Sequence, residues 1–322
     1  MTEFETLELD SGIRIRVAAQ GAGPLVLMVH GFPESWYSWR HQIGPIAAAG
    51  YRAAAMDVRG YGGSSKPAEI EAYDLESLTS DIAAVIDRLS PGAPAVLIGH
   101  DWGAPQVWHT ALVHPERVRA VAGLSVPYLG APKASFSVLI EEVFTRRGRF
   151  FYQHYFQKSP EAEQELEADP RNFLRRFCYA ISGDAPAGAW PSDKGVEATL
   201  LQGLADPDPF PAWMSEADLD YYAAEFQRSG FRGPLNRYRN HDRDFAWQCR
   251  FAGRRIEQPA LYIGGDRDPV LSMLGRGDLL QMMQAELPDL RGAHLLPGCG
   301  HWTQQERPEA VNALLLDWLA GL

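Results

Sequence analysis

Short apolar runs alternate with helical patterns at both ends of the chain, and this alternation constrains the fold more than any other feature of the sequence. The apolar runs occupy residues 24–29, 52–57, 95–99, 118–126, 260–265 and 293–297. Uninterrupted apolar runs of this length are typical of strands buried on both faces, and strands that alternate with helices pair in parallel. We therefore predict an α/β fold with a mostly parallel central sheet flanked by helices.

Two helical patterns and one turn refine this prediction. Residues 4–9 and 13–19 flank a turn at Asp10-Ser11-Gly12 and predict a hairpin ahead of the parallel strands. The helix predicted over 74–89 has one apolar face, made of Leu75, Leu78, Ile82, Val85, Ile86 and Leu89. The last helix is predicted to start at Pro308 and to bury Val311, Leu314, Leu315, Trp318 and Leu319.

Residues 131–245 interrupt the alternation with a stretch that is helical in pattern, rich in aromatic residues and punctuated by proline and glycine. Its predicted helix starts are Ser159-Pro160-Glu161, Asp169-Pro170 and Ser215-x-x-Asp218, a capping box whose helix ends at Gly230. We therefore predict a helical cap, or lid, over 131–245, inserted between two parts of a core domain at 1–130 and 246–322.

Composition and charge exclude several classes of partner. The chain of 322 residues carries a formal net charge of −11, which argues against binding to nucleic acid or to an anionic membrane surface. Its acidic start lacks the apolar core of a signal peptide, and no apolar stretch approaches the length of a membrane span. The three cysteines form neither a Cys-x-x-Cys pair nor an even-numbered set, so a disulfide framework is not expected. We therefore expect a cytoplasmic protein with reduced thiols, whereas the charge indicates little about the substrate.

The segment Gly-His-Asp-Trp-Gly, residues 99–103, directly follows one of the apolar runs and precedes a helical pattern over 102–113. A strand followed by Gly-x-Ser-x-Gly is the nucleophile elbow of a hydrolase, and here Asp101 takes the serine's place. Backbone N–H groups at the start of a helix stabilise a carboxylate, so Asp101 is a candidate nucleophile. The alternative is that Asp101 only caps that helix.

An aspartate nucleophile leaves an alkyl ester on the enzyme, and a histidine with an orienting acid is then needed to activate water. His301 lies among glycines on a loop near the end of the chain, where such a histidine is expected. Asp266 and Asp268 both follow the apolar run 260–265 and are candidates for the acid. The order nucleophile, acid, histidine is that of the α/β hydrolases.

Ester hydrolysis also requires N–H groups that stabilise an oxyanion. Trp102, directly after the candidate nucleophile, supplies one N–H group, and Phe32 in the segment His-Gly-Phe-Pro-Glu-Ser-Trp (30–36) supplies the second. Glu34 lies in the same segment and is a candidate for positioning the hydrolytic water.

The segments HGFPESW (30–36), GHDWGA (99–104), FRGPLNRYRN (231–240) and GCGHWTQ (298–304) together resemble, in order, the motifs of soluble-type epoxide hydrolases of the α/β-hydrolase fold. The resemblance spans essentially the whole chain. It implies that Asp101 is the nucleophile, His301 the base and Asp268, rather than Asp266, the orienting acid. It also implies a cis peptide bond between Phe32 and Pro33.

The same resemblance implies two cap tyrosines that bind the epoxide oxygen. One maps to Tyr238, and the other falls in FYQHYFQ (151–157), where spacing alone does not choose between Tyr152 and Tyr155. The resemblance favours Tyr152, which is followed by Gln153. The substrate pocket is expected to comprise Phe32, Trp102, Gln153, Tyr155 and Phe156.

The implied activity is conversion of an apolar epoxide and water to a vicinal diol, an ether-bond hydrolysis that needs no metal or organic cofactor. Two alternatives are a haloalkane or fluoroacetate dehalogenase with the same aspartate nucleophile, and a non-catalytic hydrolase fold that binds a small ligand. Haloalkane dehalogenases often have a halide-binding asparagine where this chain has Phe32, and they lack the paired cap tyrosines. The sequence leaves open the natural epoxide, a homodimer and a detoxification role.

Overall fold

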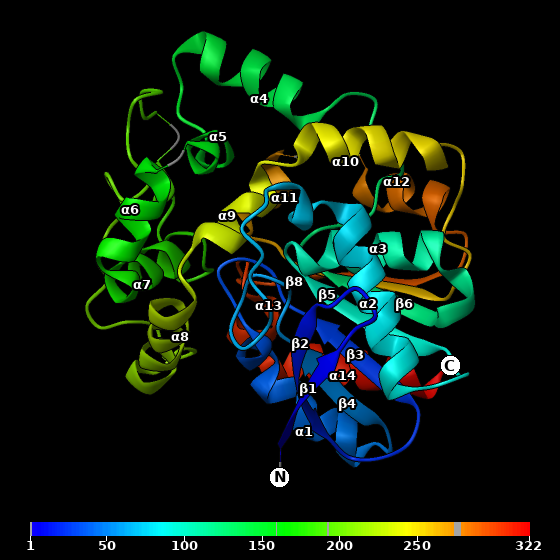
Figure 1. Ribbon diagram of the computed structural model, residues 1–322. Helices are drawn as coiled ribbons and strands as arrows, with labels where there is room; N and C mark the ends of the chain where they lie inside the picture. Colours follow the sequence, from blue (N-terminus) through cyan, green and yellow to red (C-terminus); the bar gives the residue numbers. More distant parts are fainter. Residues whose placement is uncertain (1, 159, 192, 274–277) are drawn as a thin grey trace.

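An eight-stranded sheet forms the centre of the protein in the computed structural model, which describes residues 2–158, 160–191, 193–273 and 278–322 (Figure 1). The strand order is β1-β2-β4-β3-β5-β6-β7-β8. The strands are β1 (Glu3–Glu8), β2 (Arg14–Gln20), β3 (Leu25–Val29), β4 (Arg52–Met56), β5 (Ala95–His100), β6 (Val118–Leu124), β7 (Ala260–Gly265) and β8 (Leu290–Leu296).

The sheet is parallel from β4 to β8 and antiparallel at its N-terminal edge. β1 pairs antiparallel with β2, and β2 pairs antiparallel with β4. The other neighbours, from β3 and β4 to β7 and β8, are all parallel. The predicted mostly parallel sheet and the hairpin at Asp10-Ser11-Gly12 are therefore confirmed.

Two separate apolar cores cover the two faces of the sheet. On one face α2 (Leu75–Leu89) and α3 (Gly103–Val113) pack with Leu27, Val29 and Leu97. On the other face α1 (Arg40–Ala48) and α14 (Pro308–Ala320) pack with Val26 and Ile98. The apolar side chains predicted for α2 are all buried, and α14 starts at Pro308 as predicted. Leu314 was expected in the core but is only partly buried on α14.

The helices between β6 and β7 gather to one side of the sheet and above it, and α5 to α8 lie on the left in Figure 1. They are α4 (Phe136–Val143), α5 (Tyr152–Gln157), α6 (Glu161–Ala168), α7 (Pro170–Ala180), α8 (Glu216–Ser229), α9 (Arg232–Tyr238) and α10 (His241–Gln248). The predicted helix starts at Pro160 and Asp169 and the Ser215 capping box are present, while Ser159 lies outside the described residues. The cap boundaries at 131 and 245 stay a prediction.

The carboxyl ends of the parallel strands meet at one edge of the sheet, and loops from four strands converge there. Phe32 follows β3, Asp101 follows β5, Asp268 follows β7 and His301 follows β8. Residues far apart in sequence therefore meet at this edge, as the topology of a parallel sheet requires. The last helices are α11 (Pro269–Met273), α12 (Leu279–Glu286) and α13 (Thr303–Glu306). Within the described part of the chain, no helix combines the length and apolar character needed to cross a membrane.

Replacement of the fully buried Ile82 on α2 by alanine should lower the free energy of unfolding by about 3 kcal/mol, because it removes buried methyl and methylene groups and leaves a cavity. Urea unfolding followed by circular dichroism measures this change. Ser80→Ala on the exposed face of α2 is the matched control and should change stability by less than about 0.5 kcal/mol. Equal effects of the two substitutions would contradict the assigned buried face.

Candidate active site

Asp101 lies on a strained turn between β5 and α3. Its backbone has a φ of 49°, in the left-handed region that residues with a Cβ rarely adopt. The turn is tight: a Cβ on Gly99 would lie 2.3 Å from the carbonyl oxygen of Gly103, and a Cβ on Gly103 would lie 2.1 Å from that of Val29. Only glycine fits at these two positions, so the predicted elbow is present and projects the Asp101 carboxylate above the sheet edge.

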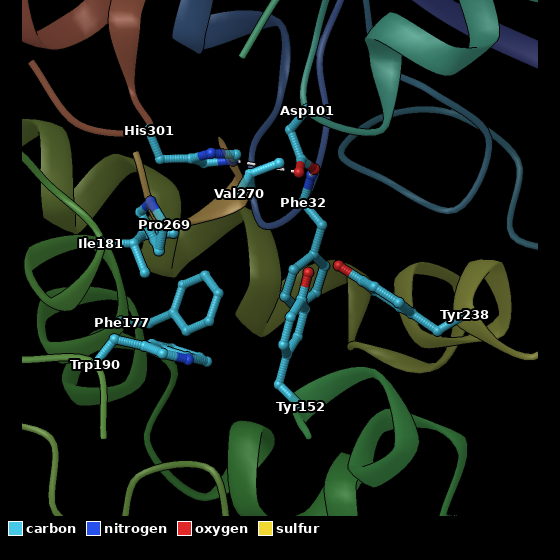
Figure 2. A pocket seen from close by; sticks show the side chains of 10 residues that line it. All are labelled: Phe32, Asp101, Tyr152, Phe177, Ile181, Trp190, Tyr238, Pro269, Val270 and His301. Atoms are coloured by element: carbon cyan, nitrogen blue, oxygen red, sulfur yellow. Dashed lines mark hydrogen bonds and ion pairs between the residues drawn. The ribbon is translucent and has the colours of Figure 1, made fainter. Parts of the chain in front are cut away.

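His301 lies between two carboxylates. Its Nε2 is 3.2 Å from Oδ2 of Asp101, and its Nδ1 is 2.9 Å from Oδ2 of Asp268 (Figure 2 draws the contact with Asp101). Asp266, the other candidate acid, instead accepts a hydrogen bond from the N–H of Gly298 at 2.8 Å on the surface. The structure therefore brings together the three residues that the resemblance selected.

The pKa values of this group are strongly coupled. Burial opposes the charged imidazole, but the charge of Asp268 and hydrogen bonds with both carboxylates raise the pKa of His301 well above its ordinary value. Burial likewise favours the neutral form of Asp101, but its hydrogen bond with His301 and the imidazole charge lower the pKa of Asp101. The resting site therefore holds an ionised Asp101 beside a protonated His301.

The backbone N–H of Phe32 donates a hydrogen bond of 2.8 Å to Oδ1 of Asp101. Gly31 allows this contact, since a Cβ at that position would lie 2.3 Å from the same oxygen. The Phe32-Pro33 peptide bond is cis, as the resemblance implied. Trp102 follows Asp101 directly and occupies the N-cap position of α3. The structure therefore places both of the expected oxyanion-binding residues beside Asp101.

Glu34 is a buried carboxylate with four polar partners and lies beneath the site rather than in it. Its Oε2 accepts from the N–H of Gly31 at 2.9 Å and faces Nδ1 of His100 at 2.8 Å. Its Oε1 accepts from the side-chain amides of Gln304 at 3.0 Å and Gln305 at 3.2 Å. The structure places this carboxylate where it ties the loop after β3 to the loop after β8, so the suggested role in holding water stays a prediction.

Two tyrosines from different cap helices face Asp101. Tyr152 begins α5 and Tyr238 ends α9, and Figure 2 shows their hydroxyl groups directed toward each other and toward the carboxylate of Asp101. Burial, together with the charge of Asp101, raises the pKa of both phenols above the ordinary value. Both hydroxyl groups therefore carry their protons and can donate hydrogen bonds to an oxygen placed between them.

The three other residues of α5 that were expected in the substrate pocket lie in different surroundings. Gln153 donates a 2.8 Å hydrogen bond to the hydroxyl of Tyr152, and Phe156 packs edge-on against Phe32 and Tyr238. Tyr155 packs against Phe150 and its hydroxyl pairs with Glu165, away from Asp101. Residues three apart on a helix differ in direction by about 60°, which is enough to point Tyr152 and Tyr155 to different neighbours.

Two spaces of very different size reach Asp101. A small cavity of about 30 Å³ lies between Asp101, His301 and the two tyrosines, and a larger one of about 370 Å³ extends over α3 and α10. Sequence reasoning missed several residues that line them: Phe177, Ile181, Trp190, Pro269, Val270, Arg237 and His241. Pro269 and Val270 could have been predicted as lining residues, because they directly follow Asp268 in the sequence. No sequence signal indicated the lining residues from the segment between β6 and β7.

Comparison with known proteins places the chain among α/β hydrolases. Residues 24–308 match the family described as alpha/beta hydrolase fold. Epoxide hydrolase A of Mycobacterium tuberculosis is 43% identical over 99% of this chain and 98% of its own length. The bifunctional epoxide hydrolase 2 of Rattus norvegicus is 42% identical over 96% of this chain, which corresponds to 54% of that longer protein.

Solved structures give the same relationship. An epoxide hydrolase from an endophytic Streptomyces superposes with a TM-score of 0.94 at 44% identity, covering 99% of this chain and 96% of its own. Epoxide hydrolase A from Mycobacterium thermoresistibile superposes with a TM-score of 0.92 at 41% identity, covering all of this chain and 99% of its own. The similarity includes the cap as well as the core.

Replacement of Glu34 by glutamine should lower the free energy of unfolding by about 2 kcal/mol at neutral pH. In the parent protein each carboxylate oxygen faces a polar partner, such as the Gln304 amide on one side and the His100 ring on the other. The amide of the variant would place an N–H₂ group where one of these oxygens was, so that the partner there would lose its acceptor. Burial opposes the charged Glu34, but His100 and the N–H of Gly31 lower its pKa. The stability that this shift contributes is present above the pKa of an unfolded glutamate and is lost as the pH falls through the folded value.

The difference between the parent protein and Glu34→Gln should therefore shrink in acid, which urea titrations at several pH values measure. Glu142→Gln, at an exposed position on α4, is the matched control and should leave the unfolding curves unchanged. A destabilisation by Glu34→Gln that is independent of pH would contradict the ionised state assigned to Glu34.

Proposed function

The chain belongs to the α/β-hydrolase fold family, within its epoxide hydrolases, and we propose that it converts an epoxide and water to a vicinal diol. One observation carries the proposal for this chain's own residues. Two protonated phenols, Tyr152 and Tyr238, face a carboxylate, Asp101, that is paired with a histidine. This arrangement presents an acid on one side of a small substrate and a nucleophile on the other.

In the first step the Asp101 carboxylate attacks one ring carbon, and the bond between that carbon and the epoxide oxygen breaks. The electron pair of the broken bond goes to the oxygen, which becomes an alkoxide unless it is protonated or strongly hydrogen-bonded. Tyr152 and Tyr238 donate hydrogen bonds to this oxygen, and one of them gives it a proton. The product is a hydroxyalkyl ester of Asp101.

In the second step His301 removes a proton from water, and the resulting hydroxide attacks the carboxyl carbon of Asp101. Negative charge then develops on Oδ1, the oxygen that already accepts the hydrogen bond from Phe32. The N–H of Trp102 is the second donor that we assign to this oxyanion. The intermediate collapses, the bond to the diol oxygen breaks, and that oxygen takes the proton from His301. Asp101 is left as a carboxylic acid and gives its proton to His301, which restores the resting ion pair. The phenol regains a proton from solvent, which balances the proton that His301 released to solvent after the ester formed.

Esterification of Asp101 also prepares His301 for its role as base. The negative charge of Asp101 is one cause of the raised pKa of His301, and it disappears when the ester forms. The pKa of His301 therefore falls, and the imidazole loses its proton more readily at the stage where a neutral base is needed. Asp268 remains paired with Nδ1 and keeps the ring directed at the ester.

Two features favour an epoxide over a haloalkane as the substrate. A leaving halide needs no proton, whereas an epoxide oxygen does, and Tyr152 and Tyr238 supply one. The residue beside the nucleophile is Phe32, whose side chain packs against Phe156 and cannot hydrogen-bond a halide.

The two steps draw on side chains of this chain alone, so no metal or organic cofactor is required. The free cysteines support a cytoplasmic location.

Mixing the His301→Gln variant with styrene oxide should give a protein heavier by the mass of one whole epoxide. The first step adds the substrate without a leaving group, and the second step needs the base that this variant lacks. Intact mass spectrometry detects the adduct, while chromatography of the diol measures turnover by the parent protein. Asp101→Asn should give no adduct under the same conditions.

A haloalkane tested in parallel should release no halide from the parent protein. Halide release together with absent diol formation would reject the epoxide assignment in favour of a dehalogenase. A folded protein with neither activity and no adduct would favour the non-catalytic alternative.

Single variants Tyr152→Phe and Tyr238→Phe should each slow alkylation roughly a hundredfold, because losing one donor to a developing oxyanion costs about 3 kcal/mol. The remaining hydroxyl still supports the alkoxide in each single variant. The double variant should be nearly inactive, since no hydroxyl then faces the oxygen. Single-turnover measurement of ester formation gives these rates.

Tyr155→Phe is the matched control on the same helix and should alkylate at the parent rate, because its hydroxyl pairs with Glu165. Loss of alkylation in Tyr155→Phe with retention in Tyr152→Phe would show that the wrong tyrosine was assigned. Full activity of the double variant would remove the acid from the mechanism.

A further inference from the structure

The two cavities that reach Asp101 divide the space around the reacting atoms unequally. Both are lined by Asp101, Tyr152 and Val270, so they meet where the epoxide ring would lie. One, the small chamber, has a volume of about 30 Å³ and lies toward Trp190. The other, the large chamber, has a volume of about 370 Å³ and lies toward α3, α10 and the segment 126–136.

Trp190 limits the small chamber. Its ring stands perpendicular to that of Tyr152, with 5.6 Å between centroids, and packs on Phe177 at 5.8 Å (Figure 2). Phe177 and Ile181 on the C-terminal part of α7 and beyond it close the remaining side. A substituent larger than a hydrogen or a methyl group on this side of the ring would collide with the indole. Trp190 therefore restricts which epoxides fit.

The large chamber carries polar side chains on an otherwise apolar wall. Among the described residues, Oε1 of Gln153, Nε of Arg237 and Nε2 of His241 are buried atoms without a hydrogen-bond partner, and all three side chains line this chamber. A buried polar atom without a partner is costly, and a ligand group that supplies one is favoured. The unpartnered atoms themselves are turned away from the open space, and a rotation of the side chain brings each of them to the chamber wall. The chamber is therefore suited to a substituent that has its own hydrogen-bonding group.

The charged side chain of Arg237 on this chamber is already paired, and the histidines are neutral, so the chamber favours an uncharged group on the substrate. The Arg237 guanidinium pairs with Asp244 at 2.5 Å and stacks over the ring of Trp102. Burial lowers the pKa of His241 to about 3 and that of His109 to about 4, so both imidazoles are neutral at physiological pH. A carboxylate in the chamber would compete with Asp244 for Arg237, and an ammonium group would meet that guanidinium.

We propose that the substrate class is a one-sided epoxide: the ring has a small end against Trp190 and one extended substituent in the large chamber, where an uncharged group such as a hydroxyl or carbonyl hydrogen-bonds with His241 and its polar neighbours. This inference rests on the proposed function and specifies its substrate. The orientation places the extended substituent over α3 and α10 and leaves the ring oxygen between Tyr152 and Tyr238.

The first experiment compares terminal epoxides of equal length that end in a methyl group, a hydroxyl group or a carboxylate. In the parent protein kcat/KM for the carboxylate should be the lowest of the three. His241→Leu should lower the ratio of kcat/KM for the hydroxyl epoxide to that for the methyl epoxide about fivefold, the effect of one lost hydrogen bond. His154→Leu on α5 is the matched control and should leave this ratio unchanged.

The second experiment compares trans-stilbene oxide, which has a phenyl group on each ring carbon, with styrene oxide, which has one. The ratio of kcat/KM for the former to that for the latter should rise about tenfold in Trp190→Ala, because space opens for the second ring. Trp190→Phe should give a smaller rise in the same direction. Trp213→Ala, at a cap tryptophan that packs on Phe210, is the matched control and should leave the ratio unchanged.

The outcomes separate this inference from the function on which it rests. A parent protein that forms diol from styrene oxide, with both ratios unaffected by the variants, would overturn the inference and leave the proposed function intact. A carboxylate epoxide hydrolysed faster than its methyl counterpart would also overturn it. A parent protein that hydrolyses none of the epoxides would reject the proposed function and the inference together.

Discussion

One imidazole held between two carboxylates is the interaction on which the rest of the site depends. His301 contacts Asp101 at 3.2 Å and Asp268 at 2.9 Å, and these residues come from the ends of three parallel strands. The same contacts keep Asp101 ionised and His301 protonated until the ester forms. Position and charge are therefore set by one geometry, and that geometry exists only because the strand ends share one edge of the sheet.

Buried polar groups beneath the site hold this geometry in place. His100 reaches the backbone oxygen of His301 at 2.8 Å through one ring nitrogen and Glu34 through the other, and Ser125 donates to the same backbone oxygen at 2.6 Å. Glu34 in turn accepts from Gly31, next to the oxyanion donor Phe32. The loops that carry Asp101, His301 and Phe32 are thus coupled through hydrogen bonds away from solvent, where such bonds are stronger.

The helices between β6 and β7 contribute the two tyrosines that we propose as proton donors opposite Asp101, and side chains that line both chambers. Tyr152 and Tyr238 come from α5 and α9. Phe156 packs against both tyrosines, and Phe32 from the core contacts Tyr238 and Phe156. Trp190 and His241, also from the cap, line the two chambers. In the proposed mechanism the strand ends therefore supply the nucleophile and the base, and the helices above them supply the acid and the substrate-facing walls.

The sequence by itself determined the sheet, the helix starts and the residues that we propose for the reaction. Strand runs such as 95–99, the glycines around Asp101 and the motif around His301 depend on neighbours in the chain, so local rules identify them. Only the tertiary structure decided that Tyr155 faces Glu165, that Glu34 lies beneath the site, and that Trp190 leaves the two chambers unequal. These properties arise from contacts between segments distant in sequence, and neither spacing nor composition encodes which side chains such segments bring together.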